Sequence, residues 1–356
     1  MSPNGMRVQR WDTFGSRTVP ERRLARAAGV AWVVLLPMVL LAPRLEAQPT
    51  LPWHGYLQAR YTEDYRNVSS FRIRRAKLWL ANKAPIEGNW FYKIQAIFRE
   101  KNAGGFTLQD VYAEYRYRSL RVKVGQMVPD FSLQRSQPDY AIPLVERAAA
   151  INNLIPSAES DARDIGVQLT FQTGNARWHS SIGMFNGNGA NTLENEDRKF
   201  LITHRTTYSL LLGEGVNGHI GYSLAYRKTD GLAFRKIYGN NTSFSGDDFR
   251  GGVEMRLRTR TWEVQGEYIQ AELEGERAWA YYVLADYRLT PNNQLVLSLD
   301  KYSDLNAARD DRPWYIVGVN HYFAGDKAKI MLDTRVQFAH RDTRYQTTIQ
   351  FQLMFH

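Results

Sequence analysis

Four basic side chains lie close together in a segment whose pattern is that of a β-strand. In residues 71–80, Arg72 and Arg74 alternate with apolar residues, and the alternation slips by one position between Arg74 and Arg75 before Lys77. One extra residue in a β-bulge has this effect, and it keeps all four bases away from the apolar face. The planar fork of arginine holds two oxygens of a phosphate or carboxylate together. The first chemistry that this sequence indicates is therefore anion recognition.

Basic residues also occupy the polar positions of other alternating segments. They are Lys93, Arg116, Arg121, Lys123, Arg205, Arg227, Arg250, Arg256 and Arg258. Acidic residues are fewer at such positions and include Asp110, Glu114, Glu254, Glu263, Glu267 and Asp286. A cavity lined by an excess of positive charge concentrates anions at its mouth. The alternative, in which these acids pair with the bases in a charge-balanced wall, stays open at this point.

Motifs that would identify an enzyme are missing from the sequence. It contains no G-x-S-x-G, H-E-x-x-H or Walker motif, and its seven histidines are scattered. The absence of cysteine excludes a disulfide scaffold, a thiolate zinc site and a catalytic thiol. We therefore predict a protein that is not an enzyme, with no catalytic residue, metal or cofactor. A barrel enzyme and a structural or adhesive barrel are the less favoured alternatives.

The elements that must position these side chains are β-strands. In residues 345–355, Ile349, Phe351 and Leu353 share one face, while Gln350 and Gln352 share the other. Alternation of this kind places one face against an apolar environment and the other against polar groups. The pattern recurs from Gly55 to Phe355 and predicts sixteen strands, so the expected class is all-β.

The connectors and the aromatic residues favour a transmembrane antiparallel β-barrel over a soluble sandwich or propeller. We expect short turns at 84–89, 119–120, 173–175, 212–218, 259–261, 290–293 and 324–326, and longer loops at 62–70, 127–162, 186–198, 229–248 and 302–312. Short turns on one rim and long loops on the other are typical of outer-membrane barrels. Aromatic girdles are predicted from Trp53, Trp90, Trp178, Trp262, Trp279 and Trp314.

The connector Met127–Ala162, the predicted third loop of the barrel, has 36 residues and an apolar content of its own. A loop of this length is more often packed than free in solvent. We expect it to fold into the lumen and narrow the pore, with Arg135, Glu146 and Arg147 at the constriction.

The N-terminal region has the organisation of an export signal. A basic stretch at 22–26 precedes an apolar run at 27–43, and Ala47 follows as a small residue suited to cleavage. We therefore predict a cleaved signal peptide over residues 1–47 and a barrel domain over residues 48–356. Residues 1–47 hold seven arginines and three acidic residues, which leaves a net charge of about +6 for the remainder. That mild charge gives no reason to expect a nucleic-acid partner.

Several segments resemble the phosphate-selective porin O and P family. They are FRIRRAKLWLAN (71–82), VYAEYRY (111–117), VKVGQMVPDFSLQRSQPD (122–139), LVERAAA (144–150), RDIGVQL (163–169) and GMFNGNGANTLENEDRK (183–199). The resemblance implies a sixteen-stranded trimeric porin in the outer membrane of a Gram-negative-type bacterium, surrounded by lipid and lipopolysaccharide. It also implies a ladder of arginines that leads phosphate or polyphosphate to a constriction containing lysine.

One feature departs from the family pattern, because no lysine occurs between Lys123 and Lys199. The lysines that the family places at the constriction are therefore missing from the third loop, which is acid-rich. We predict a water-filled, anion-preferring diffusion channel of the phosphate type. The alternative is a general porin for small polar solutes without phosphate specificity.

Overall fold

The computed structural model describes residues 53–99, 105–192, 194–195, 198–213, 215–239, 242–306, 311–338 and 342–355. The predicted signal peptide lies outside these residues. Within the described part, no helix combines the length and the apolar content needed to cross a membrane.

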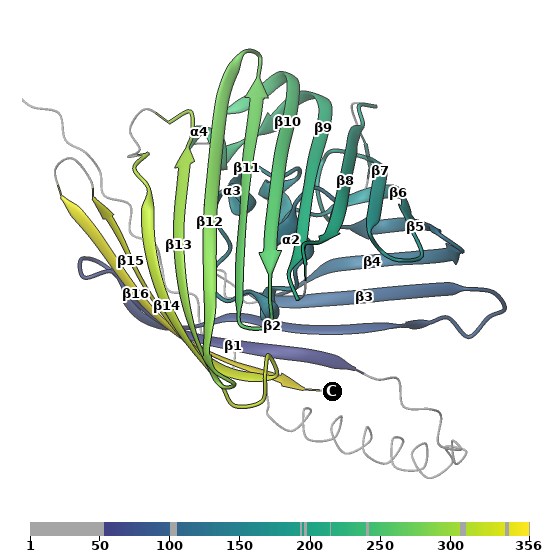
Figure 1. Cartoon of the computed structure of the whole chain (residues 1–356). Helices are drawn as coiled ribbons and strands as arrows, with labels where there is room; N and C mark the ends of the chain where they lie inside the picture. The colour runs from purple at the N-terminus through teal and green to yellow at the C-terminus, as the bar shows by residue number, and fades with distance from the viewer. Residues whose placement is uncertain are drawn as a thin grey trace, which may run out of the picture. The chain divides into compact units, whose positions relative to one another are not determined.

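Sixteen antiparallel strands form the fold (Figure 1). The first eight are β1 His54–Glu63, β2 Ser69–Lys83, β3 Trp90–Arg99, β4 Gly105–Tyr117, β5 Leu120–Met127, β6 Asp164–Gln172, β7 Trp178–Phe185 and β8 Leu201–Leu211. The last eight are β9 Asn217–Ala233, β10 Ser243–Arg258, β11 Trp262–Leu273, β12 Glu276–Thr290, β13 Asn293–Ser303, β14 Trp314–Tyr322, β15 Ala328–Phe338 and β16 Thr343–Phe355. Each strand pairs with the next one along the chain, and β16 pairs with β1, so the barrel is closed. The predicted fold class and strand number are confirmed.

The two faces of the wall have opposite character. On β16, Leu353 is 45% exposed and Phe351 is 41% exposed, whereas Gln352 and Gln350 are almost completely buried. Large apolar side chains therefore point outward, and polar side chains point to the inner face. This is the inverse of a soluble barrel, and it suits a wall surrounded by lipid.

Two β-bulges change the inner face of neighbouring strands. The register of β1 with β2 passes from Gln58↔Arg75 to Ala59↔Ile73, which leaves Arg74 as the extra residue. The predicted slip between Arg74 and Arg75 is thus confirmed. In the pairing of β3 with β4, residues 109 and 110 of β4 lie opposite a single residue of β3, which is a second bulge. Each bulge lets two consecutive polar residues turn inward.

The bulge at Arg74 leads to a testable asymmetry between two deletions. Deletion of Arg74 restores regular alternation and leaves Arg72 and Arg75 on the inner face. Deletion of Ala76 instead forces Arg75 to the lipid face, which costs about 2–4 kcal/mol near the bilayer midplane. We expect both deletions to refold into vesicles, and the Ala76 deletion to unfold at a lower urea concentration than the Arg74 deletion. Equal unfolding midpoints for the two deletions would contradict this assignment of the bulge.

The structure corrects two sequence expectations. The loop predicted at 229–248 is shorter, because β9 continues to Ala233 and β10 begins at Ser243, where backbone pairing extends beyond the apolar part of the wall. Trp314 does not join an outer girdle. It packs against the buried apolar cluster, because its position on β14 has the same facing as the buried Ile316.

The connector between β5 and β6, residues 128–163, is called the long connector. It contains α2 Leu133–Ser136, the 3-10 turn η2 Asp139–Ala141, α3 Ala149–Asn153 and the 3-10 turn η3 Ala158–Ser160. A further short helix, α4 Arg235–Tyr238, follows β9 and packs against η3. The buried apolar cluster joins α3 to the inner faces of β11, β12 and β13, and it includes Ile151, Leu154 and Tyr282.

Candidate functional site

The carboxylate of Glu146 in the long connector gathers three arginines from β1 and β2. Its Oε1 atom accepts hydrogen bonds of 2.6 Å from Arg60 and from Arg74, and Arg74 donates a second bond of 2.9 Å to Oε2. Arg75 lies 3.5 Å from the same carboxylate. The two bulged arginines therefore meet one acidic partner, and a large part of their charge is compensated within the protein.

Asp139, which precedes Glu146 in the long connector, forms a second cluster of ion pairs. It pairs with Lys77 of β2 and accepts a 2.8 Å hydrogen bond from Arg147, which belongs to the connector itself. Arg75 lies 3.7 Å away, and the hydroxyl of Tyr56 donates a 3.2 Å bond to the same carboxylate. Asp139 and Glu146 thus hold the connector against the basic face of β1 and β2.

The opposite side of the connector is held by strands from the other half of the barrel. The backbone N–H of Val145 donates to Asp333 of β15 at 2.8 Å, and that of Ala149 donates to Asp300 of β13 at 2.9 Å. Arg250 of β10 donates to the carbonyl oxygens of residues 154 and 155. Charged side chains of the wall therefore bind the connector backbone, and the connector is fixed at both sides.

Electrostatic interactions determine the protonation of the two connector carboxylates. Burial by itself raises the pKa of Glu146, but the guanidinium groups of Arg75 and Arg74 outweigh burial and hold this pKa well below its usual range. For Asp139, burial is likewise outweighed, mainly by Lys77 and Arg75, and the pKa is again strongly lowered. Both carboxylates are therefore ionised at neutral pH.

The lowered pKa values predict how the connector responds to acid. A carboxyl whose folded pKa is depressed stabilises the folded state above its unfolded pKa of about 4, and this stabilisation is lost as the pH falls through the folded pKa. We expect the contribution of Asp139 and Glu146 to single-channel conductance to stay constant from pH 8 to pH 5. It should change only well below pH 4, when the connector is released. In Glu146→Gln, the change of single-channel conductance below pH 4 should be much smaller than in the wild type. A change of wild-type size would contradict the role assigned to Glu146.

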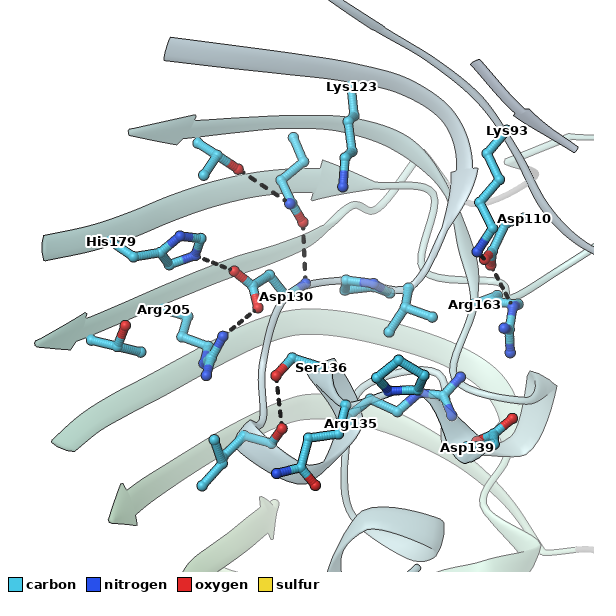
Figure 2. A pocket seen from close by; sticks show the side chains of 18 of the residues that line it. Lys93, Asp110, Lys123, Asp130, Arg135, Ser136, Asp139, Arg163, His179 and Arg205 are labelled. Carbon is cyan, nitrogen blue, oxygen red and sulfur yellow. Dashed lines mark hydrogen bonds and ion pairs between the residues drawn. The ribbon is translucent and has the colours of Figure 1, made fainter. Parts of the chain in front are cut away.

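A cavity of about 630 Å³ lies between the connector and the inner faces of strands β1–β10. Nine Lys or Arg side chains line it against three Asp. Lys93 and Arg163 approach Asp110 from two sides, and Lys123 reaches toward the connector from β5 (Figure 2). A second cavity of about 390 Å³ shares Arg256 and Gln137 with the first. Among the described residues, Arg256 forms no ion pair, so its charge is available to a solute in either cavity.

The remaining predicted site residues lie at different places on the wall. Arg72 is exposed, Arg116 and Lys123 approach Glu114, Arg121 donates to Gln172, and Arg258 pairs with Glu263. Arg135 donates to the carbonyl oxygen of Asp161, while its Nε atom is buried without a hydrogen-bond partner in the described part of the chain. The predicted set therefore forms a connected basic surface only around the first cavity, and its role in anion binding stays a prediction.

Sequence reasoning missed several residues of this site. Arg60 and the aromatic residues Tyr56, Trp79 and Tyr140 were not proposed, although the last three line the cavity. A signal for Trp79 was present, because it follows Arg75 and Lys77 at spacings of two on the same strand. No comparable signal existed for Tyr140, which lies in an irregular segment.

One cluster brings Ser, His and Asp side chains together without forming a catalytic triad. Asp130 accepts hydrogen bonds from Ser181 at 2.9 Å and from Arg205 at 2.7 Å, and it lies 2.7 Å from Nε2 of His179. A nucleophilic triad places histidine between serine and aspartate, so that the imidazole takes the serine proton. Here the aspartate lies between the other two, and within the described part of the chain no histidine is hydrogen-bonded to Ser181.

Comparison with known proteins assigns the chain to a family. Residues 52–352 match the family described as phosphate-selective porin O and P. The chain belongs to this family. A search of curated proteins finds no match. The match to the phosphate-selective porin O and P family extends over nearly the whole barrel, beyond the separate segments that carry the resemblance in the sequence.

Solved porin structures share the fold of this family member. OmpF of Salmonella typhi, solved with daunomycin, is 14% identical with a TM-score of 0.63, covering 85% of this chain and 97% of OmpF. OmpT of Vibrio cholerae in its trimer form is 11% identical with a TM-score of 0.58, covering 85% and 98%. The outer membrane channel DcaP of Acinetobacter baumannii is 11% identical with a TM-score of 0.56, covering 85% and 96%. Such identities support the fold alone. Family and fold together indicate a channel, not an enzyme, in the outer membrane of a Gram-negative bacterium.

Proposed function

We propose that this porin is an anion-preferring diffusion channel for small solutes. The observation that carries the proposal is the lining of the first cavity, where nine basic side chains stand against three acidic ones. In a narrow aqueous space, such an excess lowers the barrier for anions and raises it for cations. The contacts of the long connector with both halves of the barrel favour a connector that occupies the lumen and confines solutes to the basic side.

Phosphate specificity receives less support than anion preference. The guanidinium groups of Arg60 and Arg74, which together could hold a phosphate, already donate to Glu146. A phosphate would have to displace this carboxylate, so discrimination between phosphate and chloride should be weak. The second candidate function, a general porin for small polar solutes, rests on the same ion pairs. Trimeric assembly is part of the proposal, because the OmpT structure described above is a trimer.

A reversal-potential measurement tests the proposal. In planar bilayers under a KCl gradient near 0.1 M, the wild-type channel should favour chloride over potassium, and the preference should weaken at 1 M, where screening shortens to about 3 Å. Arg256→Gln should reduce the preference, whereas Arg277→Gln should leave it unchanged, because Arg277 is exposed and pairs with Glu272 away from the cavities. A wild-type channel that favours potassium at low salt would overturn the proposal.

A further inference from the structure

One wall of the basic cavity is built from aromatic rings. Tyr56 and Trp79 come from β1 and β2, and Tyr140 comes from η2 of the connector; all three line the cavity. The rings of Trp79 and Tyr140 are nearly parallel, at 8°, with centroids 6.5 Å apart. Tyr56 meets both rings edge-on, with centroids at 6.2 and 5.9 Å. The cavity therefore has an aromatic side as well as a cationic one.

Fixed contacts hold this aromatic wall in place. The hydroxyl of Tyr56 donates to Asp139, which also binds Lys77, and the carbonyl oxygen of Tyr140 accepts a 3.1 Å bond from Gln352 of β16. His54 packs on Trp79 with centroids 5.7 Å apart. Trp79 and Tyr140 nevertheless remain only half-buried. Half-buried rings that border an aqueous cavity offer a preorganised surface to a flat apolar group.

A cationic donor lies on the same stretch of the connector. Arg135 lines the cavity five residues before Tyr140, and its Nε atom is buried with no hydrogen-bond partner among the described residues. A buried donor without a partner is costly unless a ligand or water satisfies it. Carboxylate oxygens are the natural acceptors for such a guanidinium. The connector thus presents an anion-binding group and an aromatic ring to one space.

We propose that this cavity binds organic anions carrying a planar aromatic ring, with the ring against Trp79 and Tyr140 and the carboxylate at Arg135. The inference rests on the proposed anion channel and specifies its substrate class. A volume of about 630 Å³ accommodates such a molecule, since ligand pockets commonly span about 300–1,000 Å³. Inorganic phosphate would leave the aromatic side of the cavity unused.

Three carboxylates of graded shape test the proposal. Benzoate, cyclohexanecarboxylate and acetate are added to the full-length channel in planar bilayers, and the concentration that halves the chloride current is measured for each. Benzoate should block at a concentration about threefold to tenfold lower than cyclohexanecarboxylate, because only its flat ring stacks on an aromatic face. Acetate should block least.

Variants separate the ring from the charge. Trp79→Leu and Tyr140→Leu should remove the advantage of benzoate, whereas Tyr140→Phe should retain it and Trp178→Leu, on the outer face, should change nothing. Arg135→Gln should weaken block by all three carboxylates alike and keep their order. Equal block by benzoate and cyclohexanecarboxylate in the wild type would overturn the proposal, as would an unchanged benzoate advantage in Tyr140→Leu, which alters only the connector. A potassium-selective wild type would instead overturn the anion channel itself, so the two failures are distinguishable.

Discussion

Glu146→Gln is expected to raise the chloride-to-potassium permeability ratio about fivefold at 0.1 M salt. The substitution removes one negative charge from the centre of three guanidinium groups, so their positive charge acts on the permeating ion. One elementary charge about 10 Å from an ion contributes about 0.5 kcal/mol at an effective dielectric constant of about 70, with opposite sign for chloride and potassium, so the ratio changes by about 1 kcal/mol, or about fivefold. Reversal potentials under a KCl gradient measure this change directly.

A matched variant on the same connector controls for this substitution. Glu159 is also a connector glutamate, but it is exposed and accepts a hydrogen bond from the backbone of Lys236, away from the arginines. Glu159→Gln should leave the permeability ratio unchanged. Equal shifts in the two variants would show that the effect does not come from the arginine cluster.

Glu146→Gln should also weaken the attachment of the connector. Removing one partner of a buried charge cluster destabilises by about 3–5 kcal/mol when the other charges stay behind. Arg60 keeps its bonds to Gln350 and to the carbonyl oxygen of Val145, which limits the loss. A lower unfolding temperature together with larger single-channel conductance would indicate release of the connector, whereas a change of selectivity alone would indicate an intact one.

The strands were predictable because each follows a local rule. Alternation in residues 345–355 assigned both faces of β16, and the slip at Arg74 located a bulge, because one extra residue inverts the pattern that follows it. Trp314 was misassigned for the opposite reason. Alternation on β14 places Trp314 on the inner face with Ile316, but apolar residues belong on that face only because the long connector packs on the inner wall, which no local pattern of β14 records.

The candidate site was predictable only in part. Bases on strands could be assigned to the inner face one strand at a time, so Lys77, Lys93 and Lys123 were found. Their partners could not be found in this way, because the pairing of Glu146 with Arg74 joins residues 72 positions apart through an irregular connector. The net charge of the pore wall follows from sequence, but the amount of that charge left free for a solute follows from the fold.

Joint replacement of Arg74, Arg75 and Lys77 by Gln is expected to reverse the selectivity of the channel. Three positive charges disappear while Asp139 and Glu146 remain ionised, so the permeability ratio should move toward potassium by more than about tenfold at 0.1 M salt. This is the second large effect that the ion pairs predict, and it should fade at 1 M salt.

A compensated variant distinguishes a change of electric field from a loss of structure. Adding Asp139→Asn and Glu146→Gln to the triple variant removes the two opposing charges and leaves the wall only one charge short of the wild type. Its permeability ratio should return to within about fivefold of the wild-type value, although the connector has lost most of its ionic attachment to β2. If the triple variant kept the wild-type preference, permeating ions would not pass these residues. If the compensated variant stayed potassium-selective, the reversal would reflect a displaced connector, because charge alone predicts recovery.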